Sequence, residues 1–188
     1  MNPSKTVCIL LADGFEEIEA LYPADIFKRL GINVILTGIN DLTIRGAHNI
    51  KIMADTPLSE ISSADFDALM LPGGLPGATN LRDNTDVLEL IRHAHKEHKI
   101  IAAICAAPIV LHEAGVAFGK RTTGYPDTEK LAHTVDFKFT GEKVVVDDNI
   151  ITAVGMGQAA PFTFAVAKAL GFSDEQLMHL AQNAFISI

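Results

Sequence analysis

The chain has 188 residues, 48% of them apolar, and a formal net charge of −8. Its length fits one domain, expected to span residues 1–188, and its apolar content is sufficient for a packed core, which excludes a disordered chain. Because the sequence has an acidic balance and no basic cluster, binding to nucleic acids or to anionic membranes is not expected.

The first residues and the cysteine content indicate a cytoplasmic protein. The apolar run from Thr6 to Ala12 is too short for a signal peptide with its cleavage site, and far too short to span a bilayer. Two cysteines, Cys8 and Cys105, do not make a disulfide framework. We therefore expect free thiols in a reducing compartment.

Short β-rich runs alternate with longer helical stretches. In chain order, the sequence predicts a strand at 7–11, a helix at 16–30 with a kink at Pro23, a strand at 33–37, one or two short strands at 43–53, a strand at 68–71, a helix at 86–98, a strand at 100–104, a helix at 108–114, β-rich runs at 137–139, 144–146 and 150–154, and helices at 162–170 and 174–184. This alternation predicts an α/β fold, in which a mostly parallel sheet has helices on both faces and an added hairpin. Ligand sites in such sheets lie beyond the carboxyl ends of the strands, here after Leu11, Leu71 and Ile104.

Cys105 stands where the strand at 100–104 runs directly into the helix that Pro108 helps to start. Its neighbours Ala106 and Ala107 are small, so the turn can be sharp and can present one side chain, as in a nucleophile elbow. The N–H groups of the helix start favour a thiolate and can stabilise an anionic intermediate. A buried structural cysteine is the alternative, and we give that interpretation to Cys8, in mid-strand.

Glu19 is a candidate acid on the helix packed against the sheet, where its carboxyl can face the crevice rather than water. A carboxyl buried beside a thiolate has a raised pKa and can hold or shuttle a proton. Glu16 and Glu17 are interpreted as ordinary partners of the helix dipole in the first turn.

Gly73 and Gly74 follow the strand at 68–71 and can bring backbone N–H groups close to a ligand. The sequence has neither glycine pattern typical of phosphate loops, so nucleotide binding is unsupported and an oxyanion hole fits better. Gly157, in the loop at 155–158, is a possible pocket wall, although this loop can also be a simple turn.

Histidines suggest no metal site. His95 and His98 share a helical spacing, but they lie in a final helical turn without a cysteine nearby, and structural zinc usually needs four ligands. We therefore expect neither a metal nor a cofactor. A Cys–His pair formed across the fold stays open, because sequence spacing does not reveal it.

Three motifs in order carry a family resemblance: Gly14–Glu19 (GFEEIE), Leu71–Gly74 (LPGG) and Ala102–Pro108 (AAICAAP). On these motifs the chain resembles the ThiJ/PfpI superfamily, in the branch of the Parkinson-associated protein deglycase and its bacterial relatives. The likeness covers nearly the whole chain. It implies a flavodoxin-like three-layer sandwich that forms a homodimer.

The same resemblance implies roles for the site residues. Cys105 would be a reactive, easily oxidised thiol and Glu19 its protonated partner, while Gly73, Gly74 and Ala106 would surround the sulfur. The family is associated with cofactor-free conversion of methylglyoxal to lactate, with proposed deglycation, and with protection against oxidative stress.

The chain departs from its relatives in three segments. The protease-like branch has histidine where this chain has Ala106, so peptidase activity is not expected. Other relatives bring a histidine to the thiol from the segment matching 122–126, where this chain has Gly124 and Tyr125, so Glu19 would act without a dyad. His48 occupies a position often held by arginine near the family's dimer interface. Tyr125 and His48 are therefore possible pocket walls.

Two hypotheses about function follow. The first is a cysteine-dependent enzyme acting on methylglyoxal-like α-oxoaldehydes or their adducts, with the aldehyde and a second copy of the chain as partners. The second is a redox sensor or stress chaperone in which Cys105 is oxidised to a sulfinate without significant turnover. A flavodoxin-like small-molecule binding module is a third possibility, which the missing phosphate loop argues against.

Overall fold

The computed structural model describes residues 5–134 and 137–187. Its strands are β1 (Thr6–Leu11), β2 (Asn33–Gly38), β3 (Thr43–Arg45), β4 (Lys51–Met53), β5 (Thr56–Pro57), β6 (Ala68–Leu71), β7 (Ile100–Ile104), β8 (Val144–Asp147) and β9 (Ile150–Ala153). Its α-helices are α1 (Glu17–Arg29), α2 (Gly77–Arg82), α3 (Thr85–Lys96), α4 (Pro108–Glu113), α5 (Ala159–Ala169) and α6 (Asp174–Asn183), and short 3-10 helices lie at Leu58–Glu60, Ser63–Asp65, Thr128–Leu131 and Met156–Gln158.

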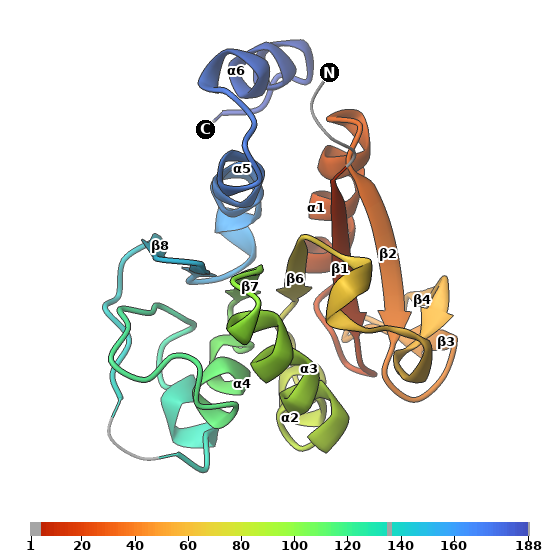
Figure 1. Ribbon diagram of the computed structural model, residues 1–188, viewed down its shortest axis with the longest axis vertical. Coiled ribbons are helices and arrows are strands. Elements are labelled where there is room, and N and C mark those ends of the chain that lie inside the picture. The colour runs from red at the N-terminus through yellow and green to blue at the C-terminus, as the bar shows by residue number, and fades with distance from the viewer. Residues whose placement is uncertain (1–4, 135–136, 188) are drawn as a thin grey trace.

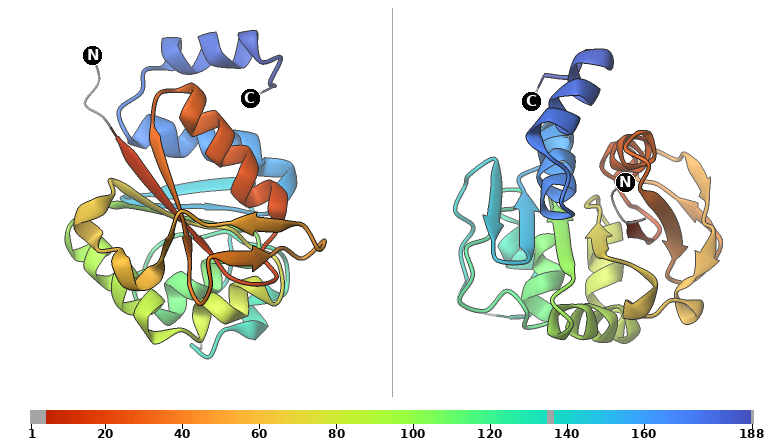
Figure 2. Two further views of the ribbon diagram at one scale, coloured as in Figure 1. Left: turned by 90° about the vertical axis from the view of Figure 1, so that its right-hand side faces the viewer. Right: turned by 45° about the horizontal axis from the view of Figure 1, so that its top comes forward.

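Seven strands form one twisted sheet in the order β5-β2-β1-β6-β7-β9-β8 (Figure 1). Every neighbouring pair is parallel except β8 and β9, which form the added hairpin. Helices α1 and α5 cover one face, with α6 packed outside α5, and α2, α3 and α4 cover the other (Figure 2). The expected flavodoxin-like α/β sandwich is confirmed.

The strand β1 shows why its sequence is a continuous apolar run. Val7, Ile9 and Leu11 belong to the core beneath α1 and α5, whereas Cys8 and Leu10 belong to the core on the opposite face. All five side chains are fully buried. A parallel strand covered on both faces needs apolar residues at every position rather than at alternate ones.

The strand order reverses at β1, which pairs with β2 on one side and with β6 on the other. Since β7 lies next to β6, the parallel strands β1, β6 and β7 end at the same edge of the sheet. This is the position at which doubly wound sheets form their ligand sites. The three segments that the sequence singled out therefore meet there.

Several predicted boundaries differ from those observed. The helix α5 begins at Ala159, before the predicted start, and α3 ends at Lys96, before the predicted end. The strand β5 and the six-residue helix α2 were not predicted, because α2 follows the turn-like residues Leu75-Pro76 and begins with Gly77. The hairpin β3-β4 agrees with the short strands expected at 43–53, and the side chain of Ser173 caps the start of α6.

The β-rich run predicted at 137–139 is wrong, because these residues form no strand. The ring of Phe137 stacks on that of His112 with 3.5 Å between centroids, and the Phe139 ring lies 5.5 Å from that of Phe137. The aromatic side chains therefore pack against α4 instead of pairing in a sheet.

No helix within the described ranges has both the length and the apolar character needed to cross a bilayer.

Candidate active site

Cys105 occupies a sharp turn between β7 and α4. Its φ of +63° is a left-handed conformation that is rare for a residue other than glycine. The Cys105 N–H donates to the carbonyl of Ala153 (2.9 Å), and the Cys105 carbonyl accepts from the N–H of Tyr125 (2.7 Å). These bonds hold the strained turn. The thiol is only partly buried, whereas Cys8 is fully buried and lies 3.3 Å from the hydroxyl of Thr37.

Glu19 and Cys105 meet at Gly73. The Glu19 side chain is fully buried, and its Oε2 accepts a hydrogen bond from the Gly73 N–H at 2.9 Å. A Cβ at Gly73 would lie 2.6 Å from the Cys105 Cβ and 2.8 Å from Glu19 Oε2, so only glycine fits between them. The second oxygen, Oε1, is buried without a hydrogen-bond partner among the described residues. That oxygen can exchange a proton with a neighbouring group.

Backbone N–H groups of Gly74 and Ala106 donate toward the Cys105 sulfur. Gly74 has a φ of +85°, and a Cβ there would lie 2.4 Å from the backbone nitrogen of Glu16, so this position also requires glycine. Ala106 is buried. Because both donors are main-chain atoms held by tight turns, they can also stabilise a developing oxyanion without reorganising.

Burial of the sulfur acts against the thiolate that the sequence indicated. Burial raises the pKa of Cys105 to about 12, and the charge of Glu19 adds to this rise, while the N–H groups of Gly74 and Ala106 oppose it. The dipole that was expected to favour the thiolate belongs to α4, which has only six residues. Desolvation of the sulfur therefore outweighs the effect of this short helix's dipole on the pKa of Cys105.

Burial also raises the pKa of Glu19 to about 7, although the hydrogen bond from Gly73 acts in the opposite direction. Below about pH 7, Cys105 and Glu19 together hold two protons, one on each group. Above it they share one proton, which resides mainly on the sulfur while the charge resides on the carboxylate. The pair is coupled, so its first ionisation belongs to both groups.

The other wall candidates are placed differently. Tyr125 adjoins Cys105 through its backbone hydrogen bond, and its half-exposed ring lies beside Gly155, where a Cβ would be 3.6 Å from Cδ2. Gly157 is exposed and faces open space. Tyr125 therefore borders the turn that carries the sulfur, and Gly157 lies at the surface.

His48 binds the start of α1 rather than the sulfur. Its Nδ1 lies 2.8 Å from Glu17 Oε2 and 3.6 Å from Glu16 Oε2, and its backbone N–H donates to Glu17 Oε1 at 2.8 Å. Glu17 is only 5% exposed, so it does more than serve as the ordinary partner of the helix dipole that the sequence indicated. Nothing in the local sequence predicts this contact, because His48 lies in the distant turn between β3 and β4.

Glu16, Glu17 and His48 also form the group of potential metal ligands that the described residues bring within 4.8 Å of one another. Their atoms already bind each other, and Oε1 of Glu17 accepts a further backbone hydrogen bond from Ile50 at 3.4 Å. We therefore interpret the group as a hydrogen-bonded ion pair. Within the described ranges, the histidines of α3 belong to no comparable group.

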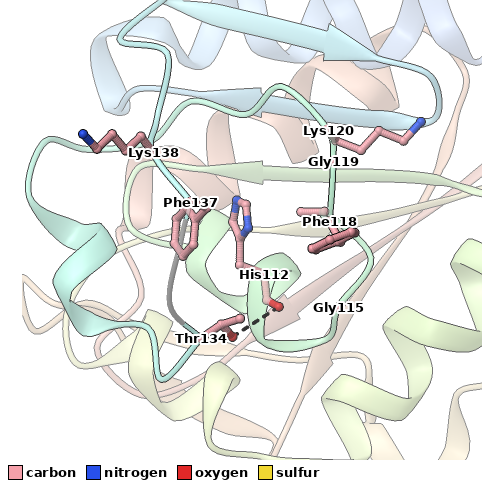
Figure 3. A pocket seen from close by; sticks show the side chains of 9 residues that line it. His112, Gly115, Phe118, Gly119, Lys120, Thr134, Phe137 and Lys138 are labelled. Carbon is pink, nitrogen blue, oxygen red and sulfur yellow. Dashed lines mark hydrogen bonds between the residues drawn. The ribbon is translucent and has the colours of Figure 1, made fainter.

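A cavity of about 530 Å³ lies away from Cys105, beside α4 (Figure 3). It is lined by His112, Gly115, Ala117, Phe118, Gly119, Lys120, Thr134, Phe137 and Lys138. Burial lowers the pKa of His112 to about 4, and its Nε2 lies 2.8 Å from the Thr122 hydroxyl. The cavity contains neither cysteine, so we place the candidate chemistry at Cys105.

The chain is similar to known proteins in both sequence and structure. The sequence model of the DJ-1/PfpI family matches residues 5–169. The chain is 36% identical to the protein dj-1beta of Drosophila melanogaster over 98% of each chain. It is 30% identical to the glutathione-independent glyoxalase DJR-1.2 of Caenorhabditis elegans over 90% of this chain and 91% of the relative.

A solved structure is similar to this protein over nearly the whole chain. The crystal structure of a cysteine-to-alanine mutant of STM1931, a DJ-1 superfamily protein from Salmonella typhimurium, superposes with a TM-score of 0.90 at 33% identity. The match covers 98% of this chain and all of that one. The chain therefore belongs to the DJ-1/PfpI family.

Proposed function

We propose that this protein is a cysteine-dependent, cofactor-free enzyme of the glyoxalase or deglycase type. It acts on methylglyoxal-like α-oxoaldehydes or on their adducts, with Cys105 as the nucleophile and Glu19 as the acid and base. The observation that carries the proposal is the close approach of Cys105 and Glu19 at Gly73, with Glu19 Oε1 buried and unpartnered among the described residues. The relative named as a glutathione-independent glyoxalase supports the same reaction class.

The first step is addition of the sulfur to the aldehyde carbon. The Glu19 carboxylate accepts the thiol proton as the S–C bond forms and the carbonyl π-bond breaks. The N–H groups of Gly74 and Ala106 stabilise the charge that develops on oxygen. Glu19 then returns the proton to that oxygen, which gives a hemithioacetal.

The second step moves hydrogen between adjacent carbons. Glu19 removes the proton from the hemithioacetal carbon while water supplies a proton to the ketone oxygen, which gives an enediol. Glu19 then delivers its proton to the former ketone carbon, and the hydroxyl on the sulfur-bearing carbon loses its proton to water and becomes the carbonyl of a thioester. One carbon is oxidised and its neighbour is reduced, so no external oxidant or reductant is needed. Water then hydrolyses the thioester, which releases lactate and restores the thiol.

The test compares the two cysteines of the chain. We expect C105S to abolish lactate formation from methylglyoxal while keeping the fold, as judged by circular dichroism. C8A is the matched control and should retain activity, because Cys8 is buried in mid-strand. Unchanged turnover in C105S would remove the proposal.

A second candidate function is redox sensing or stress protection through oxidation of Cys105. The partial exposure of Cys105, compared with complete burial of Cys8, favours selective oxidation of the first. Backbone donors at Gly74 and Ala106 would hold a sulfinate. After mild peroxide treatment, mass spectrometry should find two added oxygens confined to Cys105, and equal oxidation of both cysteines would refute selective sensing.

We also propose that the chain forms a homodimer, as the family resemblance implies. Ile18 on α1, Ile50 in the turn after β3, and Met53 on β4 are 48%, 51% and 75% exposed, which leaves apolar surface next to His48 for a second copy. Light scattering that gives a monomer mass at high concentration would contradict this assembly.

A further inference from the structure

The ring of Phe139 fills the space beside the carbonyl of Cys105. Gly124 has no side chain there, and a Cβ built on it would lie 2.5 and 2.6 Å from Cε2 and Cζ of Phe139 and 3.0 Å from the Cys105 carbonyl oxygen. The edge of the Phe139 ring therefore occupies the position that a side chain at residue 124 would take. An aromatic ring from a segment more than thirty residues away in the sequence thus lies next to the turn that carries the candidate nucleophile.

Phe139 is held in this place by its neighbours. Its ring is tilted against the rings of Phe137 and His112, with centroids 5.5 and 6.2 Å away, as is typical of favourable aromatic pairs. Those two rings are stacked on each other, and Figure 3 shows them side by side. The N–H of Thr140, the next residue, donates to the Thr122 carbonyl at 2.9 Å. The ring is therefore a fixed part of the fold.

The segment that carries Gly124 is bonded on both sides of this glycine. Before it, the Thr123 N–H donates to Thr152 Oγ1 at 2.9 Å. After it, the Tyr125 N–H donates to the Cys105 carbonyl at 2.7 Å. Within the described ranges, the Gly124 backbone itself forms no hydrogen bond. The Phe139 ring therefore supplies a contact that holds Gly124 between its two bonded neighbours.

The bond from Tyr125 matters because the backbone of Cys105 is strained. A residue with a φ of +63° keeps that conformation only where its surroundings hold it. The Cys105 N–H is held by Ala153 of β9, whereas its carbonyl is held by Tyr125. If Gly124 and Tyr125 shift, the turn can relax toward a negative φ, and the sulfur then moves away from Glu19.

We propose that Phe139 is a positioning residue for Cys105. Its ring takes the place of a side chain at position 124 and keeps the Tyr125 N–H against the Cys105 carbonyl, which holds the sulfur beside Glu19. The ring has no ionisable group, so its contribution is one of geometry. This inference deepens the proposed function and rests on it, since the geometry that Phe139 maintains is that of the proposed nucleophile.

The first experiment exchanges side-chain volume between positions 124 and 139. F139A removes the ring, and G124A forces a methyl group against it. We expect each variant to lower kcat for lactate formation from methylglyoxal at least about tenfold, with a smaller change in KM, because a small displacement of a nucleophile is costly.

The double variant G124A/F139A decides whether the two positions share one space. The added methyl group then fills part of the space that the ring has left, so kcat should be no lower than in either single variant. Independent effects would instead multiply to a loss of about 100-fold or more. A loss of that size in the double variant would overturn the inference.

A second measurement examines the turn in the resting protein. In protein labelled with carbon-13 at cysteine, the Cα and Cβ resonances of Cys105 report its backbone conformation, and those of Cys8 in the middle of β1 are an internal reference. We expect F139A to shift the Cys105 resonances and to leave those of Cys8 in place. Cys105 resonances that stay at their parental positions would overturn the inference.

F172A is the matched control for a general loss of packing. Phe172 is buried in the core beneath α1 and α5, on the other face of the sheet. F172A should lower the free energy of unfolding and leave both kcat and the Cys105 resonances unchanged. Equal changes in F172A and F139A would show that Phe139 acts only through overall stability, which would overturn its positioning role.

Should F139A fail to fold, F139L takes its place. Leucine keeps much of the apolar volume but lacks the ring edge that reaches Gly124. The Cys105 resonances should therefore still shift, and kcat should fall by a smaller factor than the one expected for F139A. Parental values of both would overturn the inference.

Failure of the inference differs from failure of the proposed function. Parental kcat and parental Cys105 resonances in F139A, together with an inactive C105S, would overturn the role of Phe139 and leave the proposed function intact. Unchanged turnover in C105S would overturn both, even where F139A shifts the Cys105 resonances.

Discussion

Glu17 and Glu19 lie on the same helix, both are buried, and yet their pKa values move in opposite directions. Burial raises the pKa of each. At Glu17, the hydrogen bonds from the side chain and backbone of His48 and from the Ile50 N–H outweigh burial, so the net pKa is lowered. At Glu19, burial outweighs the hydrogen bonds with the Gly73 N–H and with the Cys105 side chain, and the pKa rises to about 7.

The difference shows that the number of hydrogen-bond donors, and not burial alone, decides what a buried carboxyl can do. Glu17 is fully bonded and stays charged, which suits it to hold the β3-β4 hairpin. Glu19 has one oxygen without a partner and titrates near neutrality, which suits it to exchange protons with Cys105. One helix thus carries a structural and a candidate catalytic carboxylate.

The largest expected effect is on turnover. We expect E19Q to reduce kcat/KM for lactate formation from methylglyoxal about 100-fold or more, because it removes the group that moves protons. E17Q should keep activity within about tenfold and lose stability instead. Equal losses of turnover in the two variants, in folded protein, would erase the distinction between the two carboxylates.

Adding a methyl group next to each carboxylate sharpens the comparison. G73A places a Cβ against Cys105 and Glu19 Oε2, and we expect at least about a tenfold loss of turnover. G46A places a Cβ 2.3 Å from Glu17 Oε1 and should lower the free energy of unfolding by about 1–3 kcal/mol with a smaller effect on turnover. Kinetics and urea unfolding check both, and the reverse pattern would contradict these assignments.

The two glutamates should also differ in how stability depends on pH. Glu19 has a raised folded-state pKa, so the stability it contributes is present below pH 4.5 and is lost as pH rises to about 7. E19Q should therefore raise the free energy of unfolding more at pH 8 than at pH 4. The two effects should differ by at most about 3 kcal/mol. Urea midpoints measured at both pH values test this, with C8A as a control.

Glu17 has a lowered pKa, so its contribution is present above its unfolded value of 4.5 and is lost as pH falls below it. E17Q should consequently destabilise the protein at neutral pH by about 1–2 kcal/mol and much less in acid. A destabilisation of equal size at both pH values would indicate that its charge has no part in holding the hairpin.

The sequence was sufficient to locate most of the site. The apolar runs at 7–11, 68–71 and 100–104 predict buried parallel strands, and the rule for their carboxyl ends correctly brings Glu19, Gly73 and Cys105 to one edge of the sheet. Local sequence carries this information because each of these residues directly follows a strand or lies on the next helix.

Other features depend on contacts that no local pattern records. Glu17 and His48 are 31 positions apart, so an acidic residue in a first helical turn gave no sign that it would be buried and bonded. The aromatic run at 137–139 has a strand-like pattern but packs on His112. The raised pKa of Cys105 reflects the depth of burial, which the sequence of the elbow does not reveal.

The shared proton of Cys105 and Glu19 can be followed through the pH dependence of Cys105 alkylation in the parent and in E19Q. In the parent, the alkylation rate should rise with the first ionisation of the pair, near pH 7, because that step creates the minor form with a charged sulfur. In E19Q the buried thiol must ionise alone, so the midpoint should move at least about one unit higher. Superimposable profiles in the two proteins would contradict a shared proton.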